Sequence, residues 1–150
     1  MKLATALTER ANLQNKISEL SIRLNNNAKV QEGDIPSEDP NLLLKELSKC
    51  IKSLEELISR INHTNSVTFI DDKTISDYIA KKDTLKQKIS IIRNFLDTAS
   101  ERATRYSKAE IKIISTVSVV DIQKDLDKLS KELRLIEEKI EEANWTTELI

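Results

Sequence analysis

The sequence predicts an all-α protein: an elongated antiparallel four-helix bundle of helical hairpins with coiled-coil-like packing, in a single domain over residues 1–150. Three observations predict it. Apolar residues recur every three or four positions in four long segments, as they do on one face of a helix. The chain is 39% hydrophobic and 33% charged but only 3% aromatic, so we expect an aliphatic core. The only glycine and both prolines lie between residues 33 and 40.

The first helix is predicted over about residues 2–27. Its apolar stripe misses one position, where Arg10 falls in the register, and otherwise consists of Leu3, Leu7, Leu13, Ile17, Leu20 and Leu24. The helix must end in the segment 25–40, NNNAKVQEGDIPSEDP, because glycine and proline disfavour helix interiors. The acidic side chains of this segment lack the ligand order of a calcium loop, so we interpret it as a solvated connection.

The second helix is predicted over about residues 40–63. Asp39 followed by Pro40 is a start signal, an N-cap with proline at the first helical position. The apolar stripe is unbroken and consists of Leu44, Leu47, Ile51, Leu54, Ile58 and Ile61. Three further apolar residues widen it, each one position before a member of the stripe: Leu43, Cys50 and Leu57. A stripe this wide favours a bundle over a narrow two-stranded seam.

Two segments have features of short strands. Residues 66–72, SVTFIDD, gather β-formers ahead of a turn-like pair of aspartates. Residues 111–119, within IKIISTVSVV, belong to the most apolar and β-branched stretch of the chain. We expect a small β element near one or both, and the two segments could pair with each other.

The third and fourth helices are predicted over about residues 75–105 and 119–144. Capping-box spacings precede both, Thr74 with Asp77 and Ser118 with Asp121. The third stripe consists of Ile75, Tyr78, Leu85, Ile89, Ile92, Leu96, Ala99 and Ala103, with Lys82 in one core position. The fourth consists of Ile122, Leu126, Leu129, Leu133, Ile136, Ile140 and Ala143.

Composition excludes several classes of function. A net charge of −1 supplies no overall attraction for nucleic acids or anionic membranes. A local basic excess spans residues 81–112, but few aromatics accompany it, so nucleic-acid binding is disfavoured. We instead expect the basic side chains to form a solvated helix face or to complement the acidic fourth helix. No signal peptide or membrane-spanning run is evident, and a soluble cytoplasmic protein is expected.

Cofactor and metal chemistry have no motif on which to rest. His63 is the only histidine, no Glu-x-x-His pair exists, and a single glycine forms no phosphate-binding loop. Cys50 is the only cysteine and lies about 20 Å from His63 along one helix, too far for a Cys–His dyad. We therefore expect no metal and no cofactor, with Cys50 a small buried apolar residue and His63 near a helix C-terminus.

Arg10 and Lys82 stand out because they are charged residues in an apolar register. A buried charge is costly unless it is paired, so a carboxylate such as Glu9, Asp83 or Glu142 should lie close to each. Buried polar layers often fix register or oligomeric state, which we favour here over an active site. Trp145 is expected to anchor the C-terminus to the bundle or to another subunit.

Several segments together resemble a family of small bacterial helical proteins labelled septicolysin. The matching segments are LTERANLQ (7–14), NAKVQEGDIPSEDP (27–40), ISRINHTNS (58–66), RYSKAEIKIISTV (105–117) and EEANWTTEL (141–149). One departure is Asn12, where the resemblance leads us to expect an aspartate. The family name implies a pore-forming cytolysin, secreted by a non-classical route.

Three functional hypotheses follow. The leading one is a non-catalytic helical bundle that forms homo-oligomers and acts through protein contacts, because the four stripes come without a convergent catalytic set. The second is the cytolysin implied by the resemblance, with residues 111–120 long enough for one strand of a barrel. The third is an enzyme or ligand binder that uses a polar cluster around Arg10, with candidates Glu9, Arg10, Asn12, Lys82, Arg105, Tyr106 and Glu110.

Overall fold

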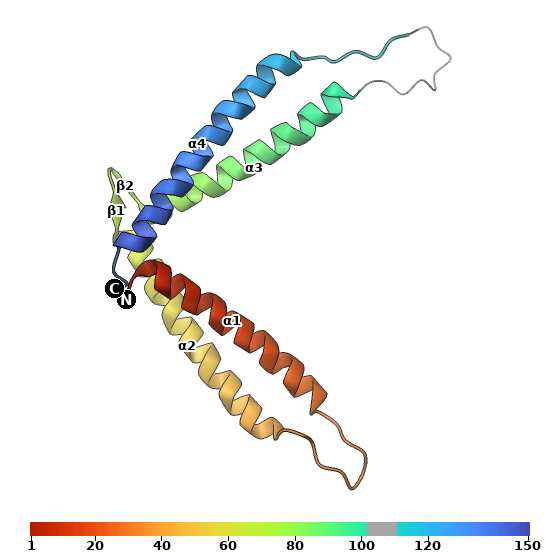
Figure 1. Cartoon of the computed structure of the whole chain (residues 1–150), viewed down its shortest axis with the longest axis vertical. Coiled ribbons are helices and arrows are strands. Elements are labelled where there is room, and N and C mark those ends of the chain that lie inside the picture. Colours follow the sequence, from red (N-terminus) through yellow and green to blue (C-terminus); the bar gives the residue numbers. More distant parts are fainter. Residues whose placement is uncertain (102–110) are drawn as a thin grey trace. The chain divides into compact units, whose positions relative to one another are not determined.

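The structure of the protein is a computed structural model, which describes residues 1–101 and 111–150. In this part of the chain it is predominantly α-helical, which confirms the predicted fold class (Figure 1). The helices are α1 (Leu3–Asn26), α2 (Pro40–Val67), α3 (Ile75–Ser100) and α4 (Val119–Thr146). Two short strands, β1 (Phe69–Ile70) and β2 (Lys73–Thr74), separate α2 from α3. The predicted end of the third helix, at residue 105, lies outside the described residues.

The predicted start signals lie where helices begin. The Asp39 carboxylate caps α2 by accepting a hydrogen bond of 2.9 Å from the backbone N–H of Asn41, and Pro40 is the first helical residue. At α4, the Ser118 hydroxyl accepts a 3.4 Å hydrogen bond from the backbone N–H of Asp121. Both caps are local interactions, which is why the sequence alone could place these two boundaries.

The small β element is a hairpin between α2 and α3. Phe69 pairs with Thr74 and Ile70 with Lys73, in antiparallel register around the two aspartates. Asp71 has a φ of 56°, in the left-handed region that aspartate tolerates better than most residues. The predicted strand near 66–72 is therefore present as β1, and its partner is the local β2.

The prediction of a second strand at 111–119 is wrong. Residues 111–118 are irregular, and α4 begins at Val119. Pairing β1 with this segment would have required closing a loop of about forty residues, whereas β2 follows β1 after a two-residue turn. Three isoleucines of the irregular segment stay largely exposed, namely Ile111, Ile113 and Ile114.

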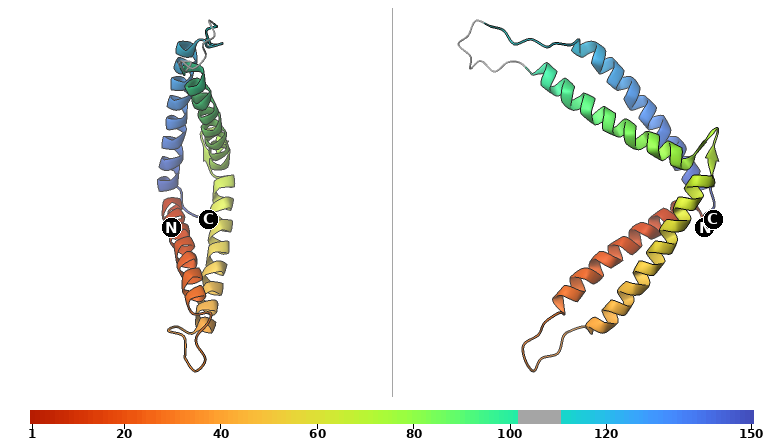
Figure 2. Two further views of the ribbon diagram at one scale, coloured as in Figure 1. Left: turned by 90° about the vertical axis from the view of Figure 1, so that its right-hand side faces the viewer. Right: turned by 180° about the vertical axis from the view of Figure 1, so that it is seen from behind.

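The chain divides into two compact units. Unit 1 consists of Met1–Ile75 with Glu142–Ile150, and unit 2 of Ser76–Glu141. In unit 1, α1 runs beside α2 as an antiparallel hairpin, and in unit 2 α3 runs beside α4 in the same way (Figure 2). Each hairpin buries aliphatic side chains along its own seam, as the low aromatic content predicts.

The core of unit 1 lies between α1 and α2. Leu20 is fully buried and packs with Leu43 and Cys50, which are 4% and 6% exposed. Leu13, Ile17, Leu24 and Leu47 pack against this cluster. Cys50 is thus the small buried residue that the sequence predicts, and it is a free thiol.

The core of unit 2 alternates apolar layers with ion pairs at its edges. The buried residues are Tyr78, Leu85, Ile89 and Leu96 from α3 and Leu126, Ile136 and Ile140 from α4. Lys81 pairs with Glu132 at 2.7 Å and Lys86 with Glu137 at 2.9 Å. Part of the basic excess in α3 is therefore neutralised by the acidic α4.

The connection between α1 and α2 is docked at both of its ends. Asn27 is only 9% exposed. Its side-chain amide donates a hydrogen bond of 2.8 Å to the backbone carbonyl of Arg23 and accepts one of 3.0 Å from the backbone N–H of Glu38. Hydrogen bonds from the Arg23 guanidinium to the Glu38 carboxylate add a further link between the end of α1 and residue 38. They also lower the pKa of that carboxyl. Gly33, with a φ of +91°, makes the left-handed turn in between.

The two termini lie together in unit 1 (Figure 1). The backbone N–H of Leu3 donates a hydrogen bond of 3.0 Å to the Thr147 carbonyl. The backbone N–H of Leu149 donates one of 2.8 Å to the Met1 carbonyl. The Glu148 carboxylate contacts the Lys2 ammonium at 2.8 Å and the N-terminal ammonium at 2.9 Å, which together lower its pKa from 4.5 to about 2. The tail therefore supplies the cap that the first turn of α1 lacks.

Candidate functional site

The predicted polar cluster is only partly described. Glu9, Arg10 and Asn12 lie on α1 in unit 1, with Glu9 and Asn12 exposed and Arg10 half-buried. Lys82 lies on α3 in unit 2 and is also half-buried. The remaining three candidates, Arg105, Tyr106 and Glu110, lie outside the described residues. The cluster as a whole stays a prediction.

The partners expected for the two charges in the apolar register differ. The Lys82 ammonium lies 3.6 Å from Asp83, one of the predicted carboxylates, which is itself exposed. The Nε of Arg10 is buried and makes no hydrogen bond within the described residues. Half-burial leaves the rest of the Arg10 guanidinium access to water, which lowers the cost of the missing carboxylate.

Trp145 does not pack the C-terminus onto unit 1. Its side chain is 62% exposed at the end of α4, whereas Leu149 is only 7% exposed. The tail is also held by Ile150, whose N–H donates 3.0 Å to the Thr64 hydroxyl and whose carbonyl accepts 3.0 Å from Arg60. The other predicted role of Trp145, contact with another subunit, stays a prediction.

The residues considered for metal or thiol chemistry lie apart from any ligand set. Over residues 1–101 and 111–150, no three His, Cys, Asp or Glu side chains come close enough to hold a metal ion. His63 is exposed, and α2 continues past it to Val67, so it is not at the helix end as predicted. The extra turn brings Thr64 into the core and lets it receive the C-terminal tail.

A row of exposed apolar side chains in unit 1 lies on α2. Leu43, Cys50 and Leu57 are buried, but their sequence neighbours Leu44 and Ile51 are 49% and 47% exposed. Ile58 continues this second row at the same seven-residue spacing and is half-buried. We call the row of Leu44, Ile51 and Ile58, with its polar rim, the open face of α2. One neighbouring helix covers the first row and cannot also cover the second.

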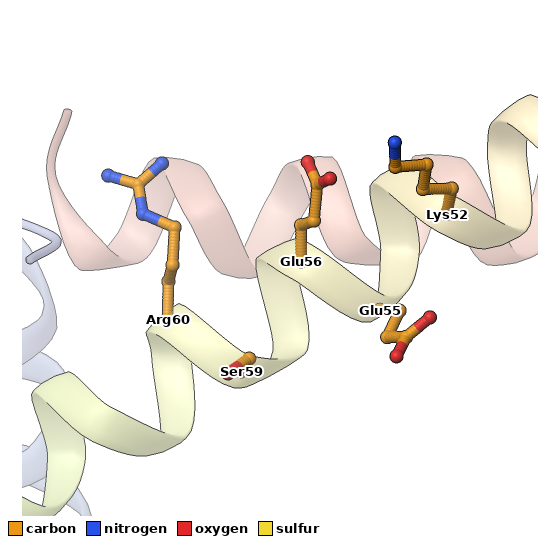
Figure 3. A pocket seen from close by; sticks show the side chains of 5 residues that line it. All are labelled: Lys52, Glu55, Glu56, Ser59 and Arg60. Carbon is orange, nitrogen blue, oxygen red and sulfur yellow. The ribbon is translucent and has the colours of Figure 1, made fainter.

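Two shallow hollows lie along this face. One, of about 550 Å³, is lined by the polar rim, namely Lys52, Glu55, Glu56, Ser59 and Arg60 (Figure 3). The other, of about 600 Å³, is lined by Ile51, Leu54, Glu55, Ile58, Ser59 and Asn62. Because Glu55 and Ser59 line both, the apolar row and the charged rim are continuous.

The rim carries both signs of charge. Lys52 and Arg60 are basic, and Glu55 and Glu56 lie between them in the sequence. In Figure 3, Lys52, Glu56 and Arg60 project to the same side of the helix and Glu55 to another. This combination of an apolar row and a charged edge can bind another helix by contact, and sequence reasoning missed it by taking both apolar rows of α2 as one wide stripe.

Unit 2 carries a smaller feature of the same kind on α3. Ile91 and Phe95 are 61% and 46% exposed. A hollow of about 280 Å³ beside them is lined by Thr84, Gln87, Lys88, Ile91 and Ile92. This hollow is smaller than either hollow on α2, and no carboxylate is among its lining residues.

Comparisons with known proteins give a family and a close structural likeness. The family described as "Family of unknown function (DUF6847)" matches residues 10–149. A crystal structure of a functionally unknown conserved protein from Corynebacterium diphtheriae is 40% identical, with a TM-score of 0.92, and the match covers 100% of this chain and 99% of that one. No curated protein matches. The resemblance to septicolysin is therefore wrong, since neither match carries that label.

Proposed function

We propose that this chain, which belongs to the family of unknown function DUF6847, is a non-catalytic helical protein that self-associates and acts through protein–protein contacts. Its partners are then a second copy and other proteins rather than nucleic acid, and the chain needs no cofactor. The observation that carries the proposal is the open face of α2, whose apolar row has no covering helix within unit 1. Apolar residues exposed in a row, rather than singly, mark interaction sites.

The row favours association but does not suffice for a tight complex by itself. Burying an exposed Leu or Ile side chain is worth about 1.5–3 kcal/mol, so three half-exposed side chains give roughly 3 kcal/mol per copy. Two copies therefore gain roughly 6 kcal/mol, which lies at the low end of the 4–15 kcal/mol estimated for lost translational and rotational freedom. Further contacts must come from the surroundings of the row, chiefly its charged rim and Leu54.

The molar mass in solution tests the proposal. Light scattering over the micromolar range should give a mass above one chain that rises with concentration. Ile51→Lys places a charge in the middle of the row and should return the mass to one chain. Ile22→Lys is the matched control, because Ile22 is 62% exposed on α1 and outside the row, so its mass should stay that of the parent.

Circular dichroism separates loss of association from loss of folding, since Ile51 is outside the α1–α2 core and the helical signal should not change. A parent protein that has the mass of one chain throughout this range refutes the proposal. So does an Ile51→Lys variant that is folded and keeps the parent mass.

The described helices do not favour a membrane role. None of those within residues 1–101 and 111–150 is long and apolar enough to cross a bilayer. The exposed isoleucines at 111–114 lie in irregular chain rather than in a strand. No observation on the described residues favours the polar cluster around Arg10 as an enzyme site over the open face of α2.

A further inference from the structure

We propose that the connection between α1 and α2 is a docking loop, whose Ile35 side chain inserts into the hollow on α3 of a second copy of this chain. We call residues 31–36 the Ile35 loop. The α3 hollow is the one of about 280 Å³ lined by Thr84, Gln87, Lys88, Ile91 and Ile92. This contact uses no residue of α2, so it goes beyond the self-association proposed above and does not depend on it.

Ile35 is exposed to water although the chain on both sides of it is held. Its side chain is 88% exposed, more than any other large apolar side chain of the described residues. On the N-terminal side, the backbone N–H of Asp34 donates a 2.9 Å hydrogen bond to the Gln31 carbonyl and closes a turn. Gly33 is the third residue of this turn and has the positive φ that a type II turn requires at that position.

The C-terminal side of the loop is restricted as well. Pro36 disfavours helical backbone at the residue before it, which is Ile35. Two residues after Pro36, the Glu38 N–H is bound by the Asn27 side chain at 3.0 Å. A loop that is already ordered loses little conformational freedom when it binds. The Ile35 loop is therefore suited to present one apolar side chain to a partner.

The charges next to Ile35 are acidic. Glu32 and Asp34 are exposed, and neither makes an ion pair within residues 1–101 and 111–150. Lys29 is the one basic residue between positions 27 and 39, and it precedes the turn. The surface that complements this loop is thus apolar, with a cation and without carboxylates.

The α3 hollow has this chemistry. Ile91 is 61% exposed, and Lys88 is the one charged residue among those that line the hollow. Lys88 is exposed and has no ion pair in the described part of the chain. A cavity of about 150 Å³ takes up a benzene molecule, so a hollow of about 280 Å³ has room for an isoleucine side chain. Both hollows on α2 include Glu55, which would repel the Asp34 carboxylate.

The other strongly exposed isoleucines of the chain fit the α3 hollow less well. Those at 111, 113 and 114 are 76–80% exposed, but they flank Lys112. Docking them would bring Lys112 towards Lys88, and like charges across an interface disfavour binding. With Ile35 in the hollow, Asp34 lies beside Lys88 instead. Because the loop and the hollow belong to the same sequence, the partner is a second copy.

NMR titration of two complementary variants tests this contact. Both variants carry Ile51→Lys, so the open face of α2 takes no part. Ile35→Asp in the ¹⁵N-labelled chain leaves only its hollow intact, and Ile91→Asp in the unlabelled chain leaves only its loop intact. A contact anchored by one side chain is weak, so the titration is carried to roughly 1 mM. The amide resonances of residues 84–92 should shift in the labelled chain, and with the labels exchanged those of residues 31–36 should shift.

The matched control is an unlabelled chain that carries both Ile35→Asp and Ile91→Asp, which should shift nothing. Asp34→Lys in the loop-bearing chain should weaken binding about fivefold, and Lys88→Glu in the labelled chain should restore it. Circular dichroism shows whether each variant keeps its helices.

The outcomes separate this contact from the proposed function. Folded variants that show no shift at residues 84–92 refute it, and so do shifts that persist with the doubly substituted control. Shifts that are unchanged by Asp34→Lys refute the pairing of Asp34 with Lys88. A parent protein with the mass of one chain at micromolar concentration refutes self-association through α2 but leaves this readout unaffected.

Discussion

Replacing Asn27 with alanine tests whether the connection between α1 and α2 is docked onto its hairpin. The Asn27 side chain joins the end of α1 to residue 38 by two hydrogen bonds, of 2.8 Å to the Arg23 carbonyl and 3.0 Å from the Glu38 N–H. The side chain is 9% exposed, so water replaces it poorly. Alanine removes both bonds and leaves the Glu38 N–H without this acceptor, whereas the Arg23 carbonyl keeps the 3.2 Å hydrogen bond from the backbone N–H of residue 27.

The expected cost follows from these two bonds. Each contributes about 0.5–1.5 kcal/mol net, so Asn27→Ala should lower the free energy of local opening by about 2 kcal/mol. The neighbouring ion pair of Arg23 with Glu38 is exposed by about two-fifths on each side, so its removal by Arg23→Gln should cost less than the loss of the two Asn27 hydrogen bonds. The amide should therefore matter more than the charges beside it.

Hydrogen exchange at the Glu38 amide measures this opening directly. About 2 kcal/mol corresponds to exchange roughly thirtyfold faster in Asn27→Ala under the same conditions. Asn26→Ala is the matched control, because Asn26 is exposed on the last turn of α1 and should leave the Glu38 amide unchanged. If exchange in Asn27→Ala stays within threefold of the parent while α1 is intact, the two Asn27 hydrogen bonds contribute little to holding the connection against α1.

Three further outcomes are expected. Leu20→Ala should cost about 3 kcal/mol of unfolding free energy in urea titrations, because Leu20 is fully buried, whereas Ile22→Ala on the same helix should cost under about 0.5 kcal/mol. Asp39→Ala removes the cap of α2 and should cost about 1 kcal/mol in the same titration. The folded pKa of Glu148 lies below its usual value, so its stabilising contribution is complete above about pH 4.5 and is lost as the pH falls towards 2. Thermal denaturation should show a smaller loss between these pH values in Glu148→Gln, and an identical loss would contradict the assignment.

Local signals placed most of the fold. Asp39, Pro40 and Ser118 act within one helical turn, so their positions in the sequence specify where α2 and α4 begin. The crowding of Gly33 and the prolines likewise specified the connection after α1. What the sequence did not show was that this connection is docked through Asn27, because an asparagine in a polar run looks like any other turn residue.

Non-local features were harder to predict. The β-branched run at 111–119 has strand propensity, but propensity alone does not form a strand without a partner at low entropic cost. The C-terminal tail caps α1 through the Thr147 carbonyl, which accepts from the Leu3 N–H, and no periodic pattern at either end signals such a contact. Of the candidate site, the sequence singles out Arg10 as a charge in the apolar register; its Nε is buried, but within residues 1–101 and 111–150 it makes no hydrogen bond to a carboxylate.

The doubled apolar row of α2 separates what stabilises the hairpin from what the protein presents to others. Leu43, Cys50 and Leu57 face α1, and truncating them should destabilise unit 1. Leu44 and Ile51, one residue further on, stay half-exposed, so polar substitutions there should leave the free energy of unfolding of the single chain nearly unchanged. A helix selected only to form this hairpin would need one row. The second row is exposed to water in the isolated chain and is stabilising only when another surface covers it, which is the physical reason to expect a partner on that side of α2.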